Sequence, residues 1–141
     1  MSRIIRVQQP TTLARAVDST ETTTFSTSGV VYLNLFKDGL DNSKEYIVTG
    51  FYIWNHDSQA NDLFAEVRNF SSLIFPRRHQ QEPKDSAGGG GGGTNQGHYT
   101  EFTGRVTPTA GQVALDVLFG TTNSGSESTI FYMELELKEL E

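Results

Sequence analysis

The chain has 141 residues, a formal net charge of −6 and no cysteine. Its length is that of one domain, and the lack of cysteine excludes disulfides, thiolate metal sites and cysteine nucleophiles. The negative charge disfavours nucleic-acid binding, and no segment approaches the roughly 20 apolar residues that a membrane-spanning helix needs.

Residues 1–10 are expected to form a basic N-terminal arm. Their apolar patch is far shorter than the core of a signal peptide, which has roughly 7–15 apolar residues. The arm contains four residues that we expect at a partner interface: Arg3, Ile4, Ile5 and Arg6. Weak strand signals lie in IIRV (4–7) and LARAVDS (13–19).

Two strong strand signals follow. GVVYLNLF (29–36) is rich in β-branched and aromatic residues, and KEYIVTGFYIW (44–54) has the same character. The polar cluster between them is typical of a turn. The pair is therefore expected to form a hairpin or a strand–loop–strand unit.

The remaining segments also read as strands. DLFAEVRNF (62–70) alternates in polarity, and SSLIF (71–75) is stopped by Pro76. YTEFTGRVTP (99–108) and GQVALDVLFG (111–120) flank a turn. In the clearest strand, 129–140, alternation places one set of side chains on the core face, namely Phe131, Met133, Leu135 and Leu137.

Helical periodicity is almost absent, and about eight or nine strands occupy the chain. Strands at this spacing predict an all-β fold, a jelly-roll-like antiparallel β-sandwich. We see no internal repeat or domain boundary, so residues 1–141 are expected to form a single domain.

The segment 77–98 is predicted to be a glycine-rich loop inserted between core strands. Its six consecutive glycines, Gly88 to Gly93, would lose much conformational freedom on ordering. The run lacks the lysine and serine or threonine of a phosphate-binding loop. Two alternatives remain, a flexible tether or a segment ordered against a neighbouring chain. We expect an assembly surface that includes Arg77, Arg78, His79, Gly88, Gly93 and His98.

The two arginines at the start of this loop, Arg77 and Arg78, are expected to project from a sheet edge. Charges there either prevent edge-to-edge pairing or bind carboxylates of a partner.

No group of residues predicts an enzyme, a cofactor or a metal centre. His56 lies in a polar turn, where an exposed histidine is expected, and no nucleophile motif accompanies it. His79 and His98 bracket the loop, but no compact ligand spacing supports a metal site. The turn at 38–45 lacks the calcium-loop pattern. We therefore expect a non-enzymatic protein.

The aromatic residues have two alternative roles. In a sandwich they are expected to fill the core, and we predict this role for the following residues: Tyr32, Phe36, Phe51, Tyr52, Trp54, Phe119, Phe131 and Tyr132. If exposed, Trp54, Tyr52 or Tyr99 would stack on a sugar, with polar contacts from the turn at 38–41. A buried tryptophan would count against this alternative.

The chain resembles accessory virion proteins of tailed bacteriophages in its length, its lack of cysteine, its short basic N-terminal arm and its eight or so strands. It is most similar to capsid decoration, or cement, proteins. Two closing segments bear on a second resemblance, FTGRVTPTAGQVALDVLFG and STIFYMELELKEL. These segments also resemble trimeric jelly rolls of the tumour-necrosis-factor type.

The resemblance implies a homotrimer that binds the major capsid protein and stabilises the shell, on the virion surface, after synthesis in the host cytoplasm. Nucleic acid and membrane are not expected partners. The first expectation is thus a virion structural protein, and the alternative is a glycan-binding β-sandwich.

Overall fold

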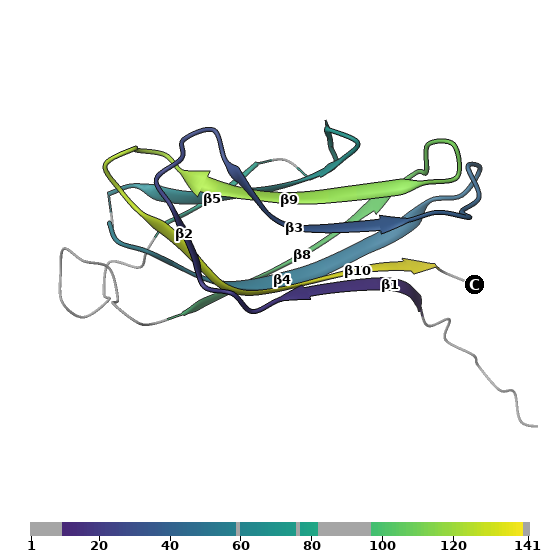
Figure 1. Ribbon diagram of the computed structural model, residues 1–141, viewed down its shortest axis with the longest axis horizontal. Helices are drawn as coiled ribbons and strands as arrows, with labels where there is room; N and C mark the ends of the chain where they lie inside the picture. Colours follow the sequence, from purple (N-terminus) through teal and green to yellow (C-terminus); the bar gives the residue numbers. More distant parts are fainter. Residues whose placement is uncertain (1–9, 59, 76, 82–96, 140–141) are drawn as a thin grey trace, which may run out of the picture.

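Two antiparallel β-sheets stack face to face in the computed structural model, which describes residues 10–58, 60–75, 77–81 and 97–139. Figure 1 shows the two layers, with β3, β9 and β5 in one and β1, β10, β4 and β8 in the other. No helix among the described residues is long and apolar enough to cross a membrane.

The first sheet has the strand order β1-β10-β4-β8, and β2 pairs with β10 beyond the end of β1. Its strands are β1 (Thr11–Asp18), β2 (Thr22–Thr24), β4 (Tyr46–His56), β8 (His98–Val106) and β10 (Ser128–Glu139).

The second sheet has the order β3-β9-β5-β6, and β7 also pairs with β5. Its strands are β3 (Val30–Lys37), β5 (Asp62–Asn69), β6 (Ser72–Leu73), β7 (Arg78–Gln81) and β9 (Val113–Thr121).

The chain switches sheets between most of its long strands. It passes from β3 to β4, from β4 to β5, from β7 to β8, from β8 to β9 and from β9 to β10 by crossing between layers. Interleaving of this kind is the jelly-roll arrangement, and it confirms the predicted fold class. The hairpin alternative for 29–36 and 44–54 is wrong, because β3 and β4 lie in different sheets. The strand–loop–strand alternative is correct.

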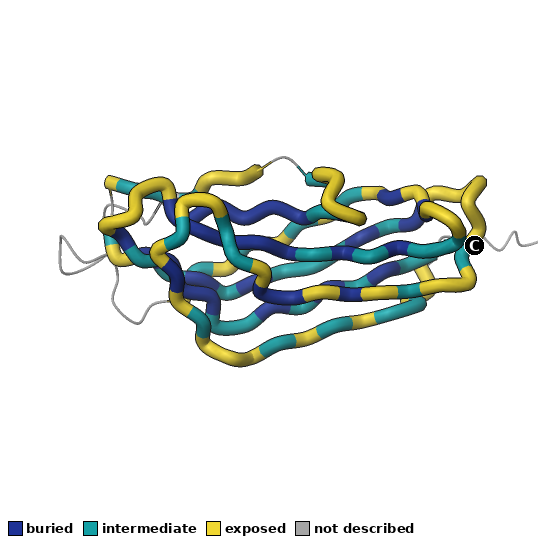
Figure 2. Tube along the Cα trace, turned by 45° about the horizontal axis from the view of Figure 1, so that its top comes forward, coloured by how far each residue is buried: buried dark blue, intermediate teal, exposed yellow. Residues whose placement is uncertain are grey.

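The core lies between the two sheets, where inward-facing side chains of both layers meet. Figure 2 shows buried positions along the central strands and exposed positions at the loops. Tyr52 and Trp54 are buried, with 2% and 4% of their surface exposed, and Tyr32 packs edge-on against Phe119 at 5.9 Å. The predicted core role is confirmed for Tyr32, Tyr52, Trp54 and Phe119. It is wrong for Phe36, which is exposed on β3, and for Phe51 and Tyr132, which lie on the outer side of the first sheet because strand alternation gives the inward positions to their neighbours.

The predicted alternation of the last strand holds except at its start. Met133, Leu135 and Leu137 are fully buried, as expected. A β-bulge between Ile130 and Tyr132 shifts the register, so Ile130 rather than Phe131 takes the core position. The core position predicted for Phe131 is therefore wrong, because a bulge inserts one residue and reverses the faces beyond it.

Strands occupy both described ends of the segment 77–98 that was predicted to be a loop, and its middle lies outside the described residues. Residues 78–81 form β7 on β5, and β8 begins at His98. The predicted strand 71–75 contracts to β6, because Phe70 and Ser71 make a turn with positive φ values of 49° and 69°. Gly88, Gly93 and the arm residues lie outside the described residues, as does the weak strand signal at 4–7.

Candidate functional site: a hollow on the outer face of the first sheet

Three aromatic rings stand in a row on the outer face of the first sheet. Tyr99 of β8 and Tyr132 of β10 flank Phe51 of β4, with ring centroids 5.3 Å and 5.6 Å from that of Phe51. The rings lie outward because neighbours such as Tyr52 and Met133 take the inward positions of the pleat. Tyr99, on the edge strand, exposes 58% of its surface.

A hollow of about 310 Å³ lies beside this aromatic row. Thr49 and Thr103 line it from the outer face, and Gly50 lines it with main chain. Gly50 lies on the inward side of β4, between Val48 and Tyr52. A Cβ there would therefore not enter the hollow but would lie 2.4 Å from the Phe102 ring on the core side. The volume is at the lower end of the range for small-molecule sites, roughly 300–1,000 Å³.

The rim of the hollow carries four charged side chains. They are Glu101, Glu134, Glu136 and Lys138. On β1, Arg15 donates from Nε to Glu134 Oε1 at 2.8 Å and lies 3.7 Å from Glu136 Oε1. Lys138 Nζ is 3.5 Å from Glu136 Oε2. Glu134 and Glu136 are therefore held by cations from β1 and β10.

The tyrosine hydroxyls extend this polar rim. Tyr99 donates to Glu101 Oε2 and Tyr132 to Glu134 Oε2, each at 3.1 Å. Partial burial, followed by the hydrogen bond to the carboxylate, raises the pKa of both tyrosines. Both phenols are therefore neutral at physiological pH and retain an acceptor oxygen for a ligand.

The hollow can bind a ligand that is rich in hydroxyl groups. Carboxylates accept hydrogen bonds, an ammonium donates them, and threonine hydroxyls do both. The face of the aromatic row can contact the C–H groups of the same ligand. With three carboxylates and one ammonium, the lining disfavours an anionic ligand.

The predicted partner-interface residues fall into two groups. Arg3, Ile4, Ile5, Arg6, Gly88 and Gly93 lie outside the described residues. The structure describes Arg77, Arg78, His79 and His98 and gives each a different environment.

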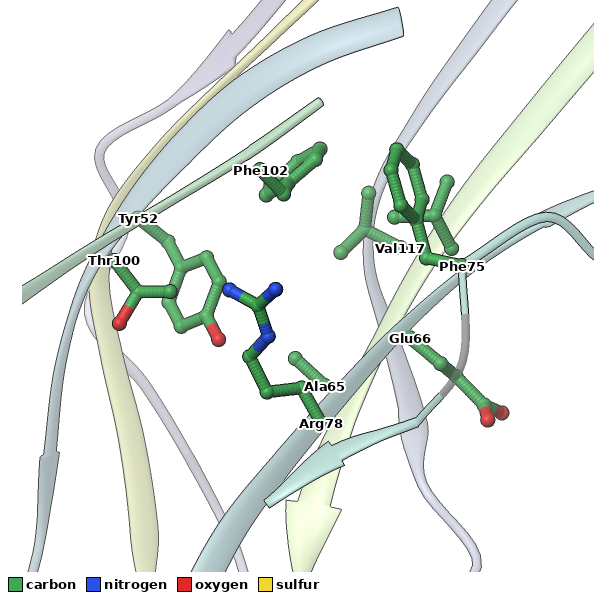
Figure 3. Close-up of a pocket in the computed structure, with 9 residues that line it drawn as sticks. Tyr52, Ala65, Glu66, Phe75, Arg78, Thr100, Phe102 and Val117 are labelled. Carbon is green, nitrogen blue, oxygen red and sulfur yellow. The ribbon is translucent and has the colours of Figure 1, made fainter. Parts of the chain in front are cut away.

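The two arginines point to opposite sides of their segment, because side chains alternate along a strand. Arg77 lies over the ring of Phe64, 3.8 Å from its centroid, and its Nε donates to Glu66 Oε2 at 3.3 Å. Arg78 points between the sheets, where Tyr52 and Thr100 are its neighbours (Figure 3). They lie at a sheet edge, as expected, but do not form one paired carboxylate clamp.

The two histidines also have separate environments. His79 Nδ1 lies 3.7 Å from Asp62 Oδ2, and the ring contacts Phe64. The ring of His98 lies 4.9 Å from that of Trp54 in the first sheet. No group of three metal-ligating side chains occurs among the described residues.

His56 is buried, so the expectation of an exposed turn histidine is wrong. Only 1% of its surface is exposed, and its Nε2 lies 3.0 Å from Thr121 Oγ1. β4 extends through His56 and carries the ring inward, where β9 supplies the partner.

The sugar-stacking role considered for Trp54 and Tyr52 is also wrong, because both are buried. Tyr99 remains available on the surface. In the predicted polar turn, Asp41 Oδ1 accepts hydrogen bonds from Ser43 N and Oγ, which lower its pKa and hold the turn.

Sequence reasoning missed the aromatic row, although a signal for it was present. Alternation within 44–54 places Phe51 and Tyr52 on opposite faces of the strand. Alternation within 129–140 does the same for Tyr132 and Met133. The missing information was the order β10-β4-β8, which brings these rings together.

No protein-family model matches the chain, and no curated protein matches it. Among solved structures it is similar to the C-terminal domain of EclA, described as a sugar-binding protein. The TM-score is 0.50 at 12% identity, over 84% of this chain and 78% of that one.

Further similarities cover smaller parts of larger proteins. The insecticidal delta-endotoxin Cry8Ea1 of Bacillus thuringiensis matches with 14% identity and a TM-score of 0.45, over 82% of this chain and 19% of the toxin. VP2 of infectious bursal disease virus matches with 10% identity and a TM-score of 0.45, over 92% of this chain and 38% of VP2. At these identities the similarities concern the fold alone.

Proposed function

We propose that this chain is a non-enzymatic carbohydrate-binding domain that holds sugar residues in the hollow on the outer face of the first sheet. One observation carries the proposal: a hollow of about 310 Å³ has an aromatic wall on one side and a rim of carboxylates, hydroxyls and an ammonium. Sugars present both an apolar C–H face and several hydroxyl groups, so both parts of the site have a counterpart.

The ligand proposed is a neutral or amino sugar. Tyr99 offers the most exposed ring, and Glu101 lies beside it as an acceptor for sugar hydroxyls. The excess of carboxylates in the rim would repel the carboxylate of an acidic sugar. The site is shallow and open, so we expect weak binding to one sugar and stronger binding to multivalent glycans.

The proposal reverses the order of the two functions predicted from the sequence. Most residues expected at the assembly surface lie outside the described residues. Arg77 already contacts the ring of Phe64 and donates a hydrogen bond to Glu66 within the chain. The hollow, in contrast, consists entirely of described side chains. Jelly rolls occur in both lectin and capsid domains, so the fold by itself favours neither function.

The test compares Tyr99→Ala with Phe36→Ala on a glycan array, followed by titration calorimetry on any neutral sugar that binds. Both side chains expose 58% of their surface, but Phe36 lies on β3 of the other sheet. We expect Tyr99→Ala to weaken binding about tenfold, as for loss of a stacking contact worth roughly 1–1.5 kcal/mol. Phe36→Ala should have no effect.

Two results would contradict this proposal. One is the absence of binding to any neutral or amino glycan. The other is binding that survives both Tyr99→Ala and Glu101→Gln, since it would then occur elsewhere on the protein.

The virion structural role remains a second candidate, in which the chain forms a homotrimer and binds a major capsid protein on the virion surface. Exposed apolar side chains on and beside the second sheet favour it, because such residues mark interaction sites when they cluster. They are Val31, Phe36, Phe70 and Leu73.

A further inference from the structure

A second cleft, which shares only Phe102 with the hollow, opens between the edges of the two sheets. Tyr52, Thr100 and Phe102 line it from the first sheet, and Phe75 and Arg78 line it from the second (Figure 3). The aliphatic side chains at its base are Ala65, Val67 and Val117. Phe75 and Phe102 meet edge-on with centroids 5.3 Å apart and close one end.

The guanidinium of Arg78 lies in this cleft without a carboxylate partner among the described residues. Its one described hydrogen bond runs from Nη1 to the main-chain oxygen of Glu101, at 3.5 Å. The nearby carboxylate of Glu66 points away from it (Figure 3) and pairs with Arg68 and Arg77. Arg78 is exposed, so a carboxylate can reach its guanidinium, which can then donate charge-assisted hydrogen bonds to it.

The size of the cleft restricts what can enter it. Its volume is about 50 Å³. A single water needs roughly 10–15 Å³ of such space, so the cleft accepts a small group of about three or four heavy atoms rather than a whole small-molecule ligand. The carboxylate head of a side chain fits that limit, with the rest of its chain outside.

The strand beside the cleft has a free edge. β8 pairs with β4 on one side, and no described strand pairs with its other side. β8 spans His98–Val106, and the edge in question is that of Tyr99–Val106. An unpaired edge of this length is a template for an additional strand, which gains affinity from main-chain hydrogen bonds.

We infer that the free edge of β8 and the Arg78 cleft together form a docking site for an extended segment of a partner protein that carries an acidic side chain on its inward face. A strand added to β8 would continue the pleat, so every second side chain would face inward beside Thr100 and Phe102. One such side chain, an aspartate or glutamate, enters the cleft and binds Arg78. The site does not depend on the sugar proposal, since Arg78 does not line the hollow.

The experiment uses two capped nine-residue peptides of alternating threonine and lysine. One has a central glutamate on the threonine face, and the other has glutamine there. Fluorescence anisotropy measures Kd for the full chain and for two variants. Arg78→Gln removes the guanidinium from the cleft, and Arg105→Gln is the matched control, because Arg105 lies on β8 but is paired with Glu45 at 3.5 Å.

We expect the Kd of the glutamate peptide to be at least about tenfold lower than that of the glutamine peptide. A difference of this size corresponds to one charge-assisted hydrogen bond between the glutamate and Arg78. Arg78→Gln should abolish this preference, and Arg105→Gln should keep it. Hydrogen exchange followed by NMR should show that alternate amides of 99–106 become protected.

Three results would overturn the inference. The first is equal affinity of the chain for the two peptides, including failure of both to bind. The second is a preference for the glutamate peptide that survives Arg78→Gln. The third is a preference for the glutamate peptide without protection of the β8 amides. The first two results exclude the carboxylate anchor, and the third excludes strand addition.

Discussion

His56 is a buried polar residue at the point where the two sheets meet. Its Nδ1 lies 3.1 Å from the amide nitrogen of Ser58, and its Nε2 lies 3.0 Å from Thr121 Oγ1. Thr121 in turn donates to the main-chain oxygen of Asn123 at 3.2 Å. The imidazole therefore connects the end of β4 to the end of β9, and its burial is tolerated because both ring nitrogens have partners.

Thr121→Val tests this connection. The substitution keeps the β-branched shape but leaves Nε2 of His56 buried without its partner. We expect the free energy of unfolding to fall by about 1–3 kcal/mol. Urea denaturation measures the change, and Thr103→Val at an exposed position of β8 is the control. Equal effects of the two substitutions would contradict the role of the His56 contact.

At the level of the elements, β5 is covered on both faces. Its inward residues meet the core, and its outward residues Phe64 and Glu66 are buried beneath Arg77. Burial disfavours the charged form of Glu66, but hydrogen bonds from Arg77 and Arg68 outweigh it and hold the pKa below the ordinary value. This cluster fixes the segment that leads into β7.

The lowered pKa of Glu66 predicts a stability that depends on pH. Its contribution is complete above the ordinary carboxyl pKa of 4.5 and is lost as the pH falls through the lower folded-state pKa. Glu66→Gln should therefore cost about 1–2 kcal/mol at pH 7, and the difference from the unchanged chain should shrink toward pH 3.

Urea denaturation across this pH range measures the difference. Glu45→Gln provides the control, since the Glu45–Arg105 pair is exposed and such pairs contribute little. A difference that stays constant from pH 7 to pH 3 would show that the charge of Glu66 does not stabilise the fold.

For the whole molecule, the two outer faces differ in character. The first sheet presents the aromatic row and its charged rim, and the second presents apolar residues of β3. The two candidate functions thus use opposite faces and can be separated by experiment.

The virion structural proposal predicts a homotrimer in solution, with a mass near three times 15.6 kDa. Light scattering after size-exclusion chromatography measures it. Phe36→Ser should then shift the trimer toward monomer, because it removes exposed apolar surface. A monomeric chain would contradict the trimer and leave sugar binding as the remaining proposal.

The sequence by itself determined the all-β class, most strand positions and the inward residues of β4 and β10, such as Trp54 and Leu135. Alternation is a local property of an extended backbone, so one strand contains its own signal. The bulge that displaces Phe131 left no such signal, because it depends on the register against β4.

Only the tertiary structure decided which strands are neighbours and which outward residues are covered. Tyr99, Phe51 and Tyr132 come from three separate strands, and Glu66 is buried by an arginine from the following segment. These features arise from contacts between residues far apart in the chain, and periodicity within a single strand carries no information about them.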